Sequence, residues 1–143
     1  MELVSPYVAA GIAGWIVSQL AKYVIASVKH GRPASYRQLY LSGHMPSAHS
    51  TTVIAVLVVI GYIDGVYSGL FGLALVFSSV VLYDAMMVRR SSGEQGIAIT
   101  ALINEHKSKV VLPRVAMGHT PLEVAVGAFL GVVVGTAVCF LMV

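Results

Sequence analysis

The sequence predicts an all-α fold: a polytopic membrane bundle of about four transmembrane helices with one further interfacial or packing helix. Of the 143 residues, 57% are apolar and only 10% are charged, whereas an average soluble domain is roughly 25% charged. The mean hydropathy is +0.85. Four apolar runs each approach the roughly 20 residues that cross a bilayer. This composition excludes a disordered, fibrous or ordinary cytosolic protein.

The first apolar run extends from about Tyr7 to Val28. At about 1.5 Å per residue it is long enough to cross a hydrocarbon core roughly 30 Å thick. Glu2 is the only charged residue before this run, and Gln19 and Lys22 interrupt its second half. A secretory signal would begin with positive charge, so we expect a retained span.

The second run extends from Ser47 to about Ile63 and follows Pro46. Proline suits the first helical turn, because the N–H that it lacks would be unpaired there. We therefore expect Pro46 to open this helix. The pair at residues 64–65 is Asp-Gly, which favours a tight turn, and a third run follows from residue 68 or 69 to Val88.

A fourth run extends from about Thr120 to Val143, and the segment before it is mixed in character. Between Gly93 and Leu112, apolar residues recur at helical spacing, which predicts an interfacial or bundle-packing helix. These residues, with one histidine among them, are Ile99, Leu102, Ile103, His106 and Val110. No repeat or linker divides the chain, so residues 1–143 are expected to form a single domain.

The charges are strongly asymmetric on this topology. Four crossings place the first and third connections on the same side of the bilayer, and all nine Lys and Arg fall there, whereas Glu2 and Asp64 lie opposite. The positive-inside rule makes the basic side cytoplasmic and both termini extracytoplasmic. The basic residues are Lys22, Lys29, Arg32, Arg37, Arg89, Arg90, Lys107, Lys109 and Arg114. They indicate an anionic partner, either lipid headgroups or a phosphate substrate, although the loop cations can simply set topology.

Three polar clusters are predicted to converge at this cytoplasmic level. They are residues 43–50 at the start of the second span, 83–90 at the end of the third and 118–123 at the start of the fourth. Ionisable groups at membrane depth are costly and usually face a bundle interior. The candidates are His49, Asp84, His119 and Glu123. The alternative for each one alone is a structural hydrogen-bond network.

Together these residues form a set suited to phosphoryl transfer. His119 and Glu123 are four residues apart, so the carboxylate can orient one imidazole nitrogen while the other attacks. His49 can protonate a leaving oxygen. Arg89 and Arg90 suit phosphate oxygens, as do the amides that open the second helix at Ser47 to His49. The set fits metal-independent hydrolysis through a phosphohistidine.

The motifs resemble a known superfamily. Pro-Ser-Ala-His at 46–49 resembles the Pro-Ser-Gly-His motif of the type 2 phosphatidic acid phosphatase and vanadium haloperoxidase superfamily. His-Thr-Pro-Leu-Glu-Val at 119–124 resembles its last motif, a nucleophilic His followed four residues later by Asp, then Val and a glycine-rich helix. With Tyr-Asp-Ala-Met-Met-Val-Arg-Arg at 83–90, the chain is most similar to the divergent, acid-phosphatase-related branch of integral membrane proteins. The resemblance spans Lys22 to Gly131.

This resemblance implies a helical bundle in which His119 attacks phosphorus, Glu123 orients it and His49 protonates the leaving group. It implies lipid phosphates or isoprenyl diphosphates as substrates, with no metal and no cofactor. Lys22 matches the lysine of the divergent branch's first span. Where the superfamily has an Arg six residues before the nucleophile, this chain has Pro113 and places Arg114 one residue later.

Other departures from the superfamily concern the anion site. We expect Arg89 or Arg90 to replace the missing arginine. Glu123 is one methylene longer than the superfamily's Asp. Asp84 has no general counterpart and can pair with an arginine, bind a substrate hydroxyl or be structural.

The leading hypothesis is therefore a cytoplasm-facing membrane lipid phosphatase. One alternative is a non-catalytic anion-binding or lipid-binding protein or small transporter, since binding and turnover need overlapping residues. Another uses His49, His119, Glu123 and Asp84 as metal ligands; Cys139, the single cysteine, provides no thiolate cluster. Haloperoxidase chemistry is the least favoured, and nothing indicates nucleic acid. The small-residue stripe can pack within one bundle or form a homo-oligomer; it consists of Gly127, Gly131 and Gly135.

Overall fold

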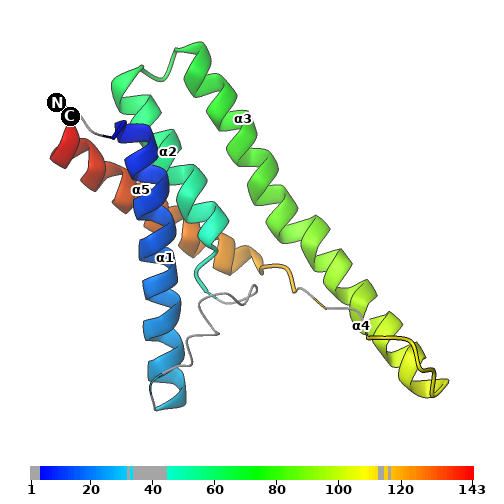
Figure 1. Ribbon diagram of the computed structural model, residues 1–143. Helices are drawn as coiled ribbons and strands as arrows, with labels where there is room; N and C mark the ends of the chain where they lie inside the picture. The colour runs from blue at the N-terminus through cyan, green and yellow to red at the C-terminus, as the bar shows by residue number, and fades with distance from the viewer. Residues whose placement is uncertain (1–3, 32, 34–44, 113–114, 116) are drawn as a thin grey trace.

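The computed structural model describes residues 4–31, 33, 45–112, 115 and 117–143, and every regular element in those ranges is helical. The all-α prediction is confirmed. In Figure 1 the helices pack as a small bundle from which one long helix extends. The elements are α1 (Pro6–His30), α2 (Ala48–Ile63), α3 (Gly69–Tyr83), the π-helical turn η2 (Asp84–Val88), α4 (Arg89–Glu105) and α5 (Pro121–Met142).

Three of the described helical stretches are long and apolar enough to cross a membrane. They are α1 with 25 residues, the combined stretch from α3 to α4 with 37, and α5 with 22. α2 is also apolar but has 16 residues, which span about 24 Å at 1.5 Å per residue. Large apolar side chains point outward from the bundle, including Leu73, Phe77, Phe129 and Phe140. Such extensive exposed apolar surface suits lipid rather than water, and the chain is a membrane protein.

α2 occupies the centre of the bundle and packs against α1, α3 and α5. The buried core joins α1, α2 and α5 through Ala10, Ala55, Val59, Val134, Val138 and Cys139. The glycine stripe of α5 lies directly on α2. A Cβ on Gly127, Gly131 or Gly135 would come within 2.7 Å of the carbonyl oxygens of Ser47, Thr51 and Ala55, respectively.

The glycine stripe therefore serves a contact inside the chain. All three glycines are buried by α2, so they are not available as a surface that joins two protomers. That part of the expectation is corrected, and homo-oligomerisation itself stays a prediction.

α2 begins at Ala48, two residues after Pro46, which was expected to open the helix. Ser47, not Pro46, is the boundary residue: its hydroxyl accepts a hydrogen bond from the Ser50 N–H at 3.4 Å, and Pro46 precedes it. Both Pro46 and Ser47 are fully buried, so α2 begins inside the bundle. At its other end the predicted Asp64-Gly65 turn is confirmed, with Gly65 at a φ of +82° that favours glycine.

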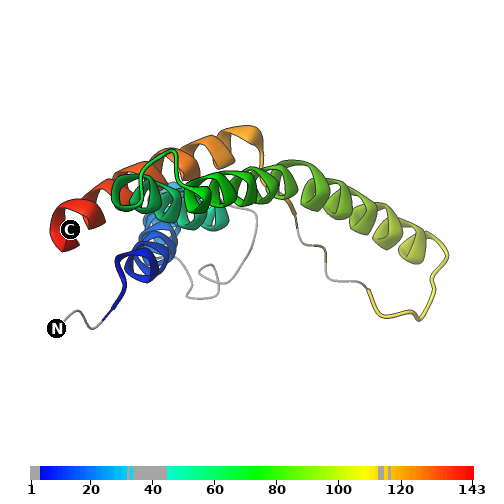
Figure 2. The same cartoon turned by 90° about the horizontal axis from the view of Figure 1, so that it is seen from above.

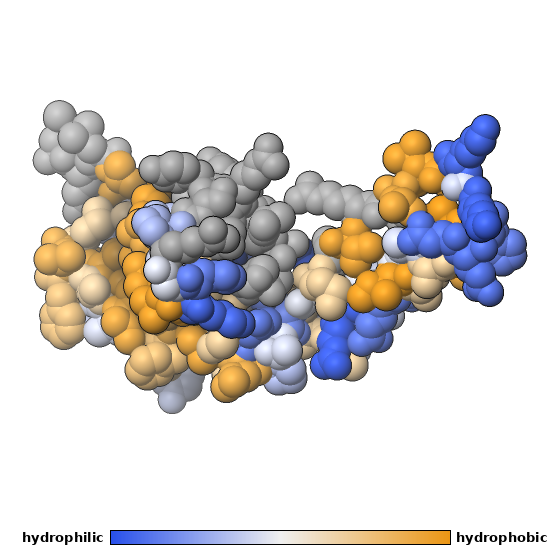
Figure 3. Space-filling model, turned by 90° about the horizontal axis from the view of Figure 1, so that it is seen from below, coloured by the Kyte–Doolittle hydropathy of each residue, from blue (hydrophilic) through white to orange (hydrophobic). Residues whose placement is uncertain are grey.

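The helix of the third apolar run continues beyond Val88, where the run was predicted to end. α3, η2 and α4 form one continuous helical stretch, Gly69–Glu105, because no proline interrupts it and Gly93 is tolerated inside it. The segment expected as a separate helix from Gly93 to Leu112 is the end of this stretch and stops seven residues earlier. Figure 2 shows α4 reaching beyond the bundle, and Figure 3 shows hydrophilic residues gathered at that far end. Among the described elements α4 makes its main contacts with η2, and both the interfacial and the packing position of this segment stay predictions.

Candidate functional site

Hydrogen bonds hold the starts of α2 and α5 in register. The Ser47 N–H donates to the Glu123 carbonyl oxygen at 3.3 Å. The Thr51 hydroxyl lies 3.0 Å from the carbonyl oxygens of both Ser47 and Gly127. These contacts are buried, so they fix the starts of α2 and α5, which carry or adjoin the two histidines, in position relative to each other.

His119 and Glu123 form the expected pair. The Nδ1 of His119 lies 3.2 Å from Oε2 of Glu123. The same oxygen accepts the Thr120 N–H at 2.9 Å, and the Thr120 hydroxyl accepts the Glu123 N–H at 3.3 Å. This reciprocal pair is a capping box, an arrangement that satisfies the unpaired N–H groups of a helix start. One carboxylate thus caps α5 and orients the imidazole.

The protonation state of His119 follows from its surroundings. Its residue surface is only 4% exposed, and this burial lowers the pKa of His119 below its ordinary value of 6.5. Glu123 opposes that shift through its hydrogen bond and charge, while the charges of Lys22 and Arg89 reinforce it. At pH 7 the imidazole is therefore neutral. A carboxylate can only accept, so Nδ1 carries the proton and Nε2 carries the lone pair.

Lys22 brings α1 into the same site. It is 8% exposed, which is unusual for a lysine without a compensating charge. Glu123 supplies that charge, and Lys22 in turn acts electrostatically on both histidines. The assignment of Lys22 to phosphate binding stays a prediction.

His49 follows the first residue of α2 and is exposed. It lies within electrostatic range of Arg89, His119, Lys22 and Asp84. The two expected histidines therefore lie near the same charged groups, and their joint role in one site stays a prediction. His119 is buried and bonded to the Glu123 carboxylate, whereas His49 is exposed.

The two arginines stand beside this site but are already paired. The Arg89 Nε donates to Asp84 Oδ2 at 2.6 Å, and the Arg90 Nε donates to Glu94 Oε1 at 3.2 Å. Of the three options for Asp84, the structure shows the ion pair with an arginine. All four side chains are at least 36% exposed, and exposed pairs of this kind are weak.

Ser47 does not match its expected role. Its hydroxyl is used by Ser50 and its N–H by Glu123, and the residue is fully buried. It is a helix cap, and its assignment to phosphate binding is corrected on that ground. Arg114 lies outside the described residues.

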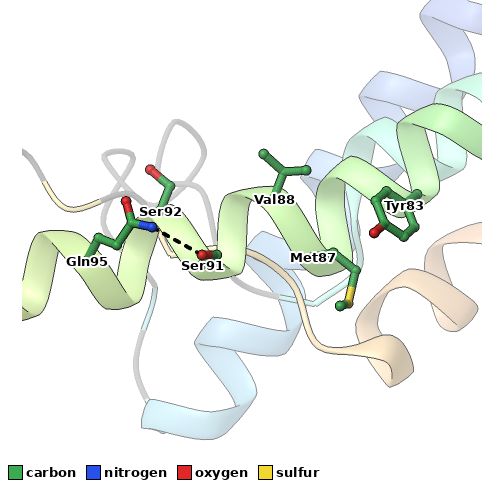
Figure 4. A pocket seen from close by; sticks show the side chains of 6 residues that line it. All are labelled: Tyr83, Met87, Val88, Ser91, Ser92 and Gln95. Atoms are coloured by element: carbon green, nitrogen blue, oxygen red, sulfur yellow. Dashed lines mark hydrogen bonds between the residues drawn. The ribbon is translucent and has the colours of Figure 1, made fainter.

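Two further observations concern metal ligands and a nearby hollow. Among the described residues, no three His, Cys, Asp or Glu side chains are placed to hold a metal ion. The hollow in Figure 4 lies on η2 and α4 and contains neither histidine. Its lining residues are Tyr83, Met87, Val88, Ser91, Ser92 and Gln95.

The sequence did not predict the contact between the last motif and η2. The His119 N–H donates to the Ala85 carbonyl oxygen at 3.0 Å. A backbone carbonyl carries no residue-type signal, and five residues of π-helix look like α-helix in the sequence. The only available signal was Gly118, which directly precedes the histidine.

The comparisons with known proteins agree with the motifs. The family described as "Divergent PAP2 family" matches residues 3–134. The "Uncharacterized membrane protein YuiD" of Bacillus subtilis (strain 168) is 29% identical to this chain over an alignment 148 residues long, and the alignment covers 92% of this chain and 93% of the relative. No solved structure matches. The resemblance drawn from the motifs is confirmed: because the family match covers nearly the whole chain, the protein belongs to the Divergent PAP2 family.

Proposed function

We propose that this protein is a membrane lipid phosphatase that hydrolyses a lipid phosphate or an isoprenyl phosphate or diphosphate without a metal, through a phosphohistidine. The observation that carries the proposal is the buried His119, bonded through Nδ1 to Glu123 at 3.2 Å. A neutral imidazole held in this way presents the Nε2 lone pair to an electrophile. Membership of a phosphatase-related family supports the same chemistry.

In the first step, Nε2 of His119 attacks phosphorus, an N–P bond forms and the P–O bond to the leaving group breaks. His49 gives its proton to the leaving oxygen. The positive charge that develops on the His119 ring is stabilised by Glu123. In the second step, His49 takes a proton from water, the water oxygen bonds to phosphorus and the N–P bond breaks, which releases phosphate and restores both histidines.

The cations bind the non-bridging oxygens in this proposal. Lys22 is buried near His119 and Glu123. Arg89 and Arg90 must exchange Asp84 and Glu94 for phosphate. Exposed ion pairs are worth about 0–1 kcal/mol, so a dianionic phosphate can displace the carboxylates.

The substrate and the orientation follow from the position of the site. It lies at one end of a bundle whose flanks are apolar, so an amphiphile can present its headgroup there while its tail stays in lipid. We propose that this end, with its excess of Lys and Arg, faces the cytoplasm.

A second function is binding without turnover, as in an anion-binding protein or small transporter. The observation that favours it is the pairing of both arginines with carboxylates; of the cations that the structure describes near His119, this leaves Lys22. Such a protein would bind phosphate at the same residues and release none.

The deciding experiment measures phosphate release by protein purified in detergent. Phosphatidic acid, phosphatidylglycerophosphate and isoprenyl phosphates and diphosphates are supplied with EDTA. His119→Ala and His49→Ala are compared with His106→Ala, an exposed histidine at the end of α4. The proposal expects release that survives EDTA and His106→Ala and disappears in the other two. Silence on every lipid with retained binding of inorganic phosphate supports the second function instead.

A further inference from the structure

The π-helical turn η2 interrupts the α-helical hydrogen-bond pattern at a specific carbonyl. In an α-helix the Arg89 N–H would bond to the oxygen of Ala85, four residues back. Here it bonds to the oxygen of Asp84, five residues back. The Ala85 carbonyl thereby loses its regular partner, and the His119 N–H donates to it at 3.0 Å.

A second, independent contact seats the loop on the same turn. A Cβ on Gly118 would lie 2.4 Å from the Arg90 nitrogen and 2.7 Å from its Cα. These are backbone atoms of a helix and cannot yield as a flexible side chain would. Only glycine allows the chain to approach this closely, so residues 118–119 are fixed against the helix at the point where the π-turn ends.

The same turn places the arginine. Arg89 directly follows η2, and the π-register puts its guanidinium 2.6 Å from the Asp84 carboxylate five residues earlier. The nucleophile's backbone and the neighbouring cation are thus anchored within five residues of one helix. Turns of this type often occur at functional sites.

We propose that η2 is the positioning element of the site: the π-turn frees the Ala85 carbonyl to hold the backbone of His119 next to Arg89, and Gly118 permits the approach. Ala85 and Gly118 are positioning residues, because neither carries a reacting atom. The catalytic meaning of this placement rests on the proposed phosphatase function. The placement of His119 itself does not.

The test compares Gly118→Ala, in the segment before α5, with Gly72→Ala, the same substitution within α3, where an added Cβ meets nothing within 4 Å. Modification of each histidine by diethyl pyrocarbonate is followed against pH by mass spectrometry. This reagent attacks the neutral ring, so the rate profile reports accessibility and pKa without requiring activity. The exposed His30 and His106 serve as internal references.

In Gly118→Ala we expect His119 to be modified at least fivefold faster at pH 7, and its titration to move up toward 6.5 as burial is lost. The kcat for phosphate release should fall at least tenfold with KM within about twofold, while Gly72→Ala matches the wild type in every readout. A folded Gly118→Ala protein with unchanged modification and kcat would overturn the inference. Reduced thermal stability without a change at His119 would overturn it as well.

Deletion of Met87 provides a second variant, since removing one residue from η2 restores the α-helical pattern. α4 makes its main contacts with η2, so its new direction costs the bundle little. We expect the same exposure of His119 as in Gly118→Ala, and protection equal to the wild type would refute the role of the π-turn. If the wild type releases no phosphate but both variants expose His119, the positioning stands and the phosphatase proposal fails.

Discussion

Replacing Glu123 by Gln tests the central pair of the site with the smallest possible change of shape. The substitution removes the negative charge that faces Nδ1 of His119 and keeps an oxygen that can still accept the Thr120 N–H. The α5 cap is therefore preserved, and we expect the free energy of unfolding to change by less than about 1 kcal/mol. Any larger effect on turnover then arises at His119.

The magnitude follows from the distance. A hydrogen bond to a charged group contributes about 1.5–3 kcal/mol, and the 3.2 Å between Nδ1 and Oε2 is longer than the roughly 2.7–2.9 Å of a strong charge-assisted bond. We therefore take the lower part of that range, about 1.5–2 kcal/mol. Since about 1.36 kcal/mol corresponds to a factor of ten in rate, kcat should fall about 10- to 30-fold.

The pH profile separates this explanation from a simple change in protonation. Glu123 raises the pKa of His119 against the dominant effect of burial. Its removal must lower that pKa further, so the acid limb of kcat moves to lower pH and more of the ring is neutral in acid. A mechanism that needed only a neutral ring would then predict equal or higher activity.

The assay is phosphate release at saturating substrate between about pH 4.5 and 8, with thermal unfolding recorded on the same samples. A kcat within threefold of the wild type would refute the reasoning. An acid limb that moves to higher pH would refute it too, because the carboxylate could not then be the group that favours the charged ring.

The remaining predictions concern the anion site and the bundle. Asp84→Asn removes the carboxylate that pairs with Arg89, so inorganic phosphate should bind about two- to fivefold more tightly in a titration, in line with the weakness of exposed ion pairs. The control is Glu105→Gln, which removes the same charge about 30 Å along the helix and should leave the phosphate affinity unchanged. Gly131→Ala places a Cβ 2.7 Å from a backbone oxygen of α2 and should lower the free energy of unfolding by about 1–3 kcal/mol, measured by denaturant titration in mixed micelles. Gly72→Ala, which fills open space, should be neutral or stabilising, and equal stability of the two glycine variants would contradict the packing described for α5.

Much of the fold followed from residue patterns, because the length of an apolar run and the residues at its ends are local properties. The turn at Asp64 and Gly65 and the start of the fourth apolar run at about Thr120 are of this kind. The continuity of the helix through Val88 was missed because hydropathy falls there, and falling hydropathy signals the end of a span but not the end of a helix.

The candidate site divides in the same way. The pair formed by His119 and Glu123 was predicted from their spacing of four residues, although His119 precedes α5 and does not lie on the face of that helix. The Ser47 assignment failed because a serine that opens a helix can either bind a ligand or cap the helix, and only its burial distinguishes the two. The contact with Ala85 could not be predicted, since it joins backbone atoms of segments separated by more than 30 residues.

The glutamate at position 123 departs from the aspartate of the superfamily motif, and the structure gives a physical reason for it. As the third residue of α5, Glu123 closes a capping box with Thr120, and a longer carboxylate is the usual partner in that motif. One of its two carboxylate oxygens, Oε2, accepts hydrogen bonds from both the Thr120 N–H and the imidazole of His119. The orientation of the proposed nucleophile is thereby coupled to the start of the helix that follows it. Because the glycine stripe packs α5 closely against α2, the imidazole is held in a fixed position relative to the bundle core.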